Sequence, residues 1–215
     1  MKNNKGFTLM ELLVAVFIAS MVTIALMTIW KASSMQTSQG QRQSIIRNNL
    51  SILMRALHRD ITESDLILAP TSGQSGGLIV AARNAYLVKE GSSNYYVMPN
   101  TVSYSKDPEG VQIESEPIAF AYCQEGNTVR RSSEIALKEL EKSSLERSSL
   151  VSALESECSS GKIYMDYVPS SGFDISTSDN INYTVSIVVH KNFEGSETPP
   201  VHVEMEKVFT KAGGA

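Results

Sequence analysis

The sequence predicts an α+β protein in which one long N-terminal helix packs on a C-terminal head of antiparallel β-strands. Three observations lead to this fold class. An uncharged apolar run is followed by an apolar stripe of helical period, no proline precedes Pro70, and short apolar runs alternate with turn residues beyond it. With 215 residues, the chain is long enough for one domain with a sizeable core and an appendage.

Composition argues against two functional classes. The net charge is −4, and the chain lacks the clustered lysines and arginines of a nucleic-acid surface. Its two cysteines are too few for a disulfide scaffold or a thiolate zinc site. No nucleic-acid partner is therefore indicated.

The apolar run Leu12–Trp30 carries no charge. As a helix it spans roughly 28 Å, about the thickness of the hydrocarbon core of a bilayer. Lys2 and Lys5 precede it, which favours a cytoplasmic start and a head outside the cytoplasm. A cleaved secretory signal is the alternative, but Trp30-Lys31-Ala32 is a poor cleavage site. We therefore expect a membrane-spanning segment over residues 7–30.

A second apolar pattern follows the polar stretch after Trp30. Apolar residues recur at intervals of three or four positions, on one side of a helix: Ile46, Leu50, Leu53, Leu57 and Ile61. We predict one helix from Phe7 to about Thr62. Its first half contacts lipid or partner helices, and its second half, residues 31–62, packs on the head.

Glu11 is the one charged residue between Phe7 and Trp30. If the chain is cut between Gly6 and Phe7, Phe7 acquires a free α-amine. Glu11 is poorly placed to reach that amine in its own helix, but it can reach the amine of an axially shifted neighbour. A buried polar pair of this kind sets register between helices.

The stretch KGFTLMELLVAVFIAS, with Gly6, Phe7 and Glu11, resembles the class III leader of type IV pilins and type II secretion pseudopilins. The resemblance implies that a prepilin peptidase removes residues 1–6 and methylates the amine of Phe7. LMRALHRD, Leu53 to Asp60, resembles the helix end of W-type minor pilins and J-type minor pseudopilins. Major pilins often have a proline at the position of Thr28, so its absence favours a minor subunit.

Residues 63–215 are expected to form the head. The predicted strands are Leu78–Arg83, Tyr95–Met98, Pro117–Cys123 at the centre of a sheet, Thr128–Arg131 in a hairpin with it, Ile163–Val168, and the antiparallel pair Tyr183–Lys191 and Val201–Phe209, joined by Asn192–Pro200. Asp107–Gly110 has the chemistry of a type I turn. Gly172–Asn182 is polar and is expected to be a loop.

Residues 132–157 are expected to form an inserted helix, with a break near Ser143-Ser144 as an option. Cys123 and Cys158 bracket this insertion. The leader implies export to a compartment where thiols are oxidised, so we expect a disulfide between them. Two buried free thiols are the alternative.

Other residues give little support for catalysis. Gly73-Gln74-Ser75-Gly76-Gly77 matches the nucleophile-elbow motif, but a strand rather than a helix is expected to follow it. His190 and His202 lie on the outward faces of the last two strands, opposite each other in one register. No third ligand is fixed by spacing, so we expect no metal site, no cofactor and no enzymatic activity.

The sequence therefore indicates a minor structural subunit of a type IV pilus or a type II secretion filament that helps to initiate or assemble it. The expected partners are other pilin or pseudopilin subunits, the prepilin peptidase and the bacterial inner membrane. The expected location is that membrane, with a single pass and the head outside the cytoplasm, and then the pilus or pseudopilus. The alternative is a membrane-anchored module for surface binding, adhesion or DNA uptake.

Overall fold

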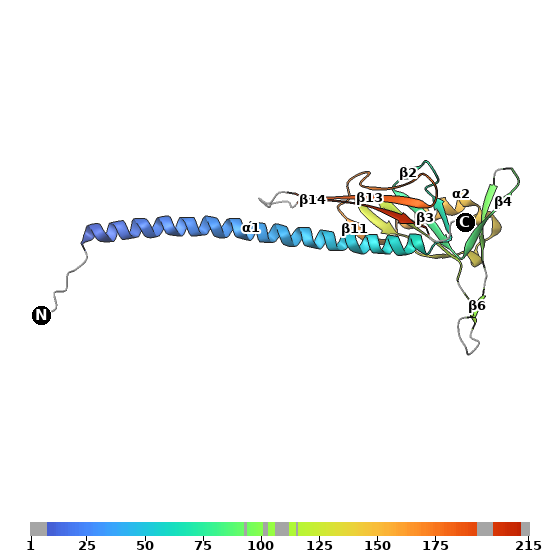
Figure 1. Ribbon diagram of the computed structural model, residues 1–215, viewed down its shortest axis with the longest axis horizontal. Coiled ribbons are helices and arrows are strands. Elements are labelled where there is room, and N and C mark those ends of the chain that lie inside the picture. Colours follow the sequence, from blue (N-terminus) through green and yellow to red (C-terminus); the bar gives the residue numbers. More distant parts are fainter. Residues whose placement is uncertain are drawn as a thin grey trace.

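One long helix carries a β-rich head at its C-terminal end (Figure 1). The computed structural model describes residues 8–92, 94–100, 103–105, 112–114, 116–192 and 200–211. The helix, α1 (Leu9–Thr62), has 54 residues, which corresponds to a length of about 80 Å. Its first half extends away from the head, and its second half lies along it. The predicted α+β fold class is confirmed.

α1 is unbroken because nothing in its sequence interrupts the backbone hydrogen bonds. Gly40 lies within the helix and does not interrupt it. No neighbouring atom lies within 4 Å of the position that a Cβ would occupy there, so no close contact requires glycine at this position. The predicted stripe is buried against the head, with Met54 as an additional member. The prediction of one helix ending near Thr62 is confirmed.

The larger sheet is six-stranded. Its main path runs β1–β3–β8–β9–β11, and β10 also pairs with β8. The strands are β1 (Leu66–Ala69), β3 (Leu78–Arg83), β8 (Ile118–Glu125), β9 (Thr128–Arg131), β10 (Ile135–Ala136) and β11 (Lys162–Asp166). β8 lies between β3 and β9, as its apolar sequence predicted.

Both faces of this sheet are covered, which explains why β8 is apolar from Ile118 to Cys123. Phe120 and Tyr122 belong to the core shared with α1, whereas Ala119 and Ala121 belong to a second core. The second core also contains Leu150 and Leu154 of α2 (Arg147–Cys158). Because neighbouring residues of a strand point to opposite faces, a strand between two cores has apolar residues at every position.

A four-stranded sheet completes the head, in the order β14–β13–β12–β2. Its strands are β2 (Ser75–Gly76), β12 (Phe173–Thr177), β13 (Asn182–Lys191) and β14 (Val201–Thr210). β13 and β14 form the predicted antiparallel pair, and the inward residues Tyr183, Val185, Ile187 and Val189 are buried. The connecting residues 193–199 lie outside the described residues.

The prediction of a loop over Gly172–Asn182 is wrong for its first half. Phe173, Ile175 and Thr177 alternate with polar residues and are buried, and β12 pairs with β13 in register. The five-residue alternation is short, and its polar members made the segment resemble a loop. Pairing with β13 decides its conformation.

Two hairpins project from the end of the head opposite to the free half of α1 (Figure 1). β4 (Ala85–Glu90) pairs with β5 (Asn94–Pro99), and β6 (Ser103–Ser105) pairs with β7 (Gln112–Glu114). The predicted strand at Tyr95–Met98 lies within β5. The predicted turn at Asp107–Gly110 lies outside the described residues.

The prediction of one helix over residues 132–157 is wrong for its first half. β10 and the 3₁₀ turns Leu137–Glu139 and Lys142–Leu145 precede α2. β9 ends opposite Tyr122, so the remaining edge of β8 needs other hydrogen-bond partners. Ser132 exchanges hydrogen bonds with Ala121, and Ile135 pairs with Ala119. Tertiary pairing thus overrides the helical preference of this segment.

A disulfide joins Cys123 of β8 to Cys158, the last residue of α2. The Cα atoms are 6.2 Å apart, and the two cysteines are separated by 35 positions in the sequence. Both cysteines are buried. The bond holds α2 against the face of the sheet opposite to α1.

We predict that the double variant Cys123→Ala/Cys158→Ala lowers the free energy of unfolding by about 3–4 kcal/mol, because opening a loop of this size raises the entropy of the unfolded chain. Urea denaturation of the full chain in detergent micelles measures the change. Reductant should bring the wild type to the stability of the variant and leave the variant unchanged. Equal midpoints for the two oxidised proteins would contradict the prediction.

Candidate functional site

The first half of α1 exposes a large apolar surface, and contact of such a surface with water is energetically unfavourable. The large apolar side chains from Leu9 to Trp30 are all more than half exposed. An 18-residue window of α1 has a mean hydropathy of 2.6 and is not buried at all, so by length and composition it is a candidate membrane span. Apolar surface of this extent marks contact with lipid or with other protein chains.

The N-terminus of α1 is closed by a capping box between Thr8 and Glu11. The backbone N–H and the hydroxyl of Thr8 each donate to Oε2 of Glu11 over 2.9 Å. The backbone N–H of Glu11 in turn donates to Oγ1 of Thr8 over 3.3 Å. In the single chain, the carboxylate of Glu11 therefore satisfies donors of its own helix start.

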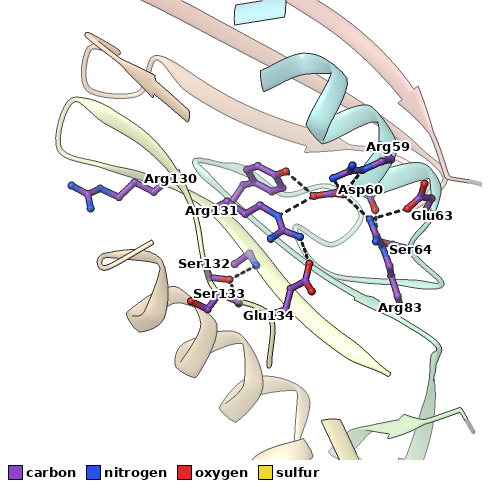
Figure 2. A network of polar contacts seen from close by, with 12 residues as sticks. Arg59, Asp60, Glu63, Ser64, Arg83, Arg130, Arg131, Ser132, Ser133 and Glu134 are labelled. Atoms are coloured by element: carbon purple, nitrogen blue, oxygen red, sulfur yellow. Dashed lines mark hydrogen bonds and ion pairs between the residues drawn. The ribbon is translucent and has the colours of Figure 1, made fainter. Parts of the chain in front are cut away.

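At the other end of α1, the carboxylate of Asp60 is buried in the head and only 1 % exposed. The hydroxyl of Tyr122 on β8 donates to Oδ2 over 2.7 Å, and Nε of Arg131 on β9 donates to the same oxygen over 3.0 Å. Nη2 of Arg83 on β3 donates to Oδ1 over 2.6 Å, and Nε of Arg59 lies 3.3 Å from Oδ1. One carboxylate thus connects α1 to three adjacent strands (Figure 2).

Two further carboxylates balance the charge of this cluster. Glu63 lies 3.1 Å from Nη2 of Arg83, and Glu134 lies 2.7 Å from Nη2 of Arg131 (Figure 2). The guanidinium of Arg131 also stacks over the ring of Phe120, 4.7 Å from its centroid. The Asp60 cluster is therefore compensated in charge and enclosed by aromatic rings.

The surroundings of Asp60 favour its ionised form. Burial alone would raise the pKa of this carboxyl, but the hydrogen bond from Tyr122 and the charges of Arg131 and Arg83 hold its pKa below the ordinary value. Burial next to Asp60 raises the pKa of the Tyr122 hydroxyl, which therefore stays protonated and donates. A depressed pKa means that Asp60 stabilises the fold at neutral pH and that this contribution is lost as pH falls through the folded-state pKa.

Comparison with known proteins identifies the N-terminal segment. The model of the prokaryotic N-terminal methylation motif matches residues 1–27. The chain carries the class III leader of a type IV pilin-like protein. The leader implies processing by a prepilin peptidase and assembly with other pilins, and the family is structural rather than catalytic. No curated protein and no solved structure gives a significant match.

The structure describes some of the predicted site residues of this pilin-like protein and not others. The cleavage-site residues Gly6 and Phe7 lie outside the described residues, so cleavage and methylation stay predictions. Glu11 lies in the first turn of α1, where it caps the helix. Cys123 and Cys158 are bonded to each other.

The other motifs are explained by the strands that contain them. Ser75 lies in β2, which leads into β3, so no helix follows it as a nucleophile elbow requires. His190 and His202 are paired directly across β13 and β14, as predicted, with ring centroids 6.0 Å apart. Within the described residues, no group of three or more histidines, cysteines and carboxylates is placed to hold a metal ion.

The Asp60 cluster is the feature that sequence reasoning missed. Two consecutive arginines such as Arg130-Arg131 are usually a basic spot on the surface, but the side chain of Arg131 is only 15 % exposed and binds Asp60. A polar residue on the buried side of a helix was the available signal, since Asp60 adjoins Ile61 at the end of the stripe. Its partners are 23, 62 and 71 positions away in the sequence.

We predict that Asp60→Asn lowers the free energy of unfolding by about 3–5 kcal/mol at neutral pH, because it leaves two partly buried guanidinium groups without their shared anion. Asp166→Asn, on the exposed side of β11, is the matched control and should change stability by less than about 0.5 kcal/mol. Denaturation of the full chain in micelles measures both.

The same experiment at lower pH tests the electrostatic cause. The wild type should lose stability as pH falls below the ordinary carboxyl range, and the difference from Asp60→Asn should shrink because both then carry an uncharged group. A difference that does not change between neutral and acidic pH would show that packing, not charge, explains the effect of the substitution.

Proposed function

We propose that this pilin-like protein is a minor pilin or minor pseudopilin of a type IV pilus or type II secretion filament and helps to initiate or assemble it. The observation that carries the proposal is the exposed apolar half of α1, which belongs to the same unbroken helix as the half that packs on the head. Because the helix is continuous, its apolar half and the head move together when the subunit passes from the membrane into the filament.

The proposed organisation has four parts. Residues 1–6 are the cleaved leader, residues 7–30 are the membrane and filament-core segment, residues 31–62 are the helix extension, and residues 63–215 are the head. The protein starts in the inner membrane with its head outside the cytoplasm. The lysines at positions 2 and 5 support this orientation.

Glu11 supplies orientation during assembly. The apolar segment leaves lipid for a filament core that is equally apolar, so hydrophobic transfer gives little net drive. A carboxylate that pairs with the amine of Phe7 on a neighbouring subunit favours one axial register. Its position in the first turn of α1 supports this pairing, because a neighbour shifted by about one helical turn would have its chain start at the level of Glu11.

The minor assignment has two supports in the sequence. No proline occurs between Phe7 and Ala69, and the helix is correspondingly unbroken where major pilins often bend. LMRALHRD ends in Asp60, so the stretch that resembles W-type and J-type minor subunits contains the residue that fixes the head to the helix.

We predict that the mature protein starts at an N-methylated Phe7. Intact mass and N-terminal sequencing of the protein from membranes of a prepilin-peptidase-positive cell measure this. Cells without the peptidase should retain residues 1–6. An intact Met1 in the presence of the peptidase, or a start after Ala32, would refute the proposed function.

We predict that Glu11→Ala leaves cleavage intact but reduces recovery of the protein in sheared filaments by about tenfold, because the register pair is worth roughly 1–2 kcal/mol in an apolar setting. Immunoblots of filament and membrane fractions measure the ratio. Thr8→Ala is the matched control, because it removes the capping partner and keeps the carboxylate.

The two variants separate capping from register. If Glu11 acts on neighbouring subunits, Thr8→Ala assembles much better than Glu11→Ala. Equal loss in both variants would show that the capping box, and not the contact between subunits, is what assembly requires.

A further inference from the structure

Two histidines face each other on the exposed side of the four-stranded sheet. His190 of β13 and His202 of β14 are direct partners in the antiparallel register, and both side chains are exposed. Their ring centroids lie 6.0 Å apart, and the two ring planes make an angle of 89°. The proposed function uses neither residue, so the pair calls for an explanation of its own.

The backbone holds this pair at short range. In an antiparallel ladder, opposite residues whose backbone groups point away from each other have the closer Cα atoms and side chains. The backbone N–H of His190 donates to the carbonyl of Tyr167 over 2.8 Å and therefore points away from β14. His190 and His202 thus form a non-hydrogen-bonded pair, for which the Cα atoms lie about 4.5 Å apart. Because β13 is held between β14 and Tyr167, the two side chains start from fixed positions.

Both imidazoles are available to a ligand. Among the described residues, no hydrogen bond or ion pair engages a ring nitrogen of His190 or His202. A neutral imidazole offers one unprotonated nitrogen and is the commonest metal ligand in proteins. With metal–nitrogen bonds of about 2.0–2.1 Å, two rings at this separation reach one ion after small rotations of their side chains.

The charges next to the pair favour a cation. Glu204 is the next outward residue on β14 after His202, about 7 Å further along the strand, and it is exposed. The neighbouring basic residue on β13, Lys191, leaves from the opposite face, and its ammonium lies 3.7 Å from the centroid of the Tyr167 ring. An ion between the two imidazoles therefore shares its face of the sheet with a carboxylate.

The kind of ligand atoms selects the metal. Among divalent first-row ions, Cu²⁺ binds nitrogen sites most tightly, and its tetragonal geometry accepts two nitrogens with oxygen atoms in the remaining positions. Cys123 and Cys158 are bonded to each other, so no thiol competes for the ion. The expectation of no metal site depended on the missing third ligand, which a catalytic zinc centre needs and a two-point chelate does not.

We propose that His190 and His202 form a two-point chelate for a divalent transition-metal ion and bind Cu²⁺ in preference to Zn²⁺. The ion links β14, at the edge of its sheet, to β13. Because it binds the paired strands more tightly than the unfolded chain, it stabilises their pairing. The inference does not depend on the proposed function, since it requires only the register and the exposure of the two strands.

Titration of the full chain with Cu²⁺ in detergent micelles, without a histidine tag, tests the proposal. The wild type should bind one ion at this site. His190→Ala and His202→Ala should each weaken the affinity at least tenfold, because a single imidazole loses the gain from a second, linked ligand. His58→Ala is the matched control: it removes the third histidine of the chain, which is exposed on α1, and should leave the affinity unchanged.

The electron paramagnetic resonance spectrum of bound Cu²⁺ checks the ligands directly. It should show two nitrogen ligands in the wild type and in His58→Ala. Zn²⁺ should bind at least tenfold more weakly than Cu²⁺. Unchanged Cu²⁺ affinity in both single variants, an equal loss in His58→Ala, or Zn²⁺ binding as tight as that of Cu²⁺ would overturn the proposal.

Stability gives an independent measurement on the same proteins. Cu²⁺ should raise the urea midpoint of the wild type and of His58→Ala, but not that of His190→Ala or His202→Ala. Because both histidines are exposed, all variants should have the midpoint of the wild type when a chelator removes the metal. An equal rise with Cu²⁺ in every variant would show that the ion binds elsewhere and would refute the site.

Discussion

The buried carboxylate of Asp60 is the interaction on which the position of the head depends. It lies at the end of a 54-residue helix and accepts hydrogen bonds from three strands that follow one another in the sheet. Burying an ion costs free energy unless other charges and hydrogen bonds compensate it. Here three guanidinium groups and a phenol surround the carboxylate, and Glu63 and Glu134 balance the remaining positive charge. Such a contact is directional, whereas the apolar stripe next to it would allow sliding.

The two sides of the six-stranded sheet have separate supports. α1 covers one face with its apolar stripe and the Asp60 cluster, and α2 covers the other face, to which the disulfide of Cys158 holds it. The sheet is thus fixed between the helix that contains the candidate membrane span and a helix that belongs to the head alone.

The two acidic residues of α1 lie near its two ends and have opposite environments. Asp60 is enclosed and compensated, so its partners all belong to the same chain. Glu11 is exposed, and in the single chain its partner is Thr8 of its own first turn. The helix between them has no acidic residue. The acidic residue that is buried in the head and the one that lies at the exposed helix start are thus almost the whole length of α1 apart.

The sequence by itself determined the long helix, its apolar half, the lone Glu11, the leader motif and the longer strands, because these signals are local or strictly periodic. The central place of β8 was also readable, since a strand between two cores is apolar at every position. Tertiary structure alone decided the rest. Ser132, Ile135 and Ala136 pair with the free edge of β8 instead of beginning a helix. The five residues of β12 become a strand through β13, and Arg131 turns inward to an aspartate 71 positions away. Each of these features depends on hydrogen bonds or charges supplied by segments that are distant in the sequence. A local sequence pattern does not show which distant group will lie next to it in the folded chain.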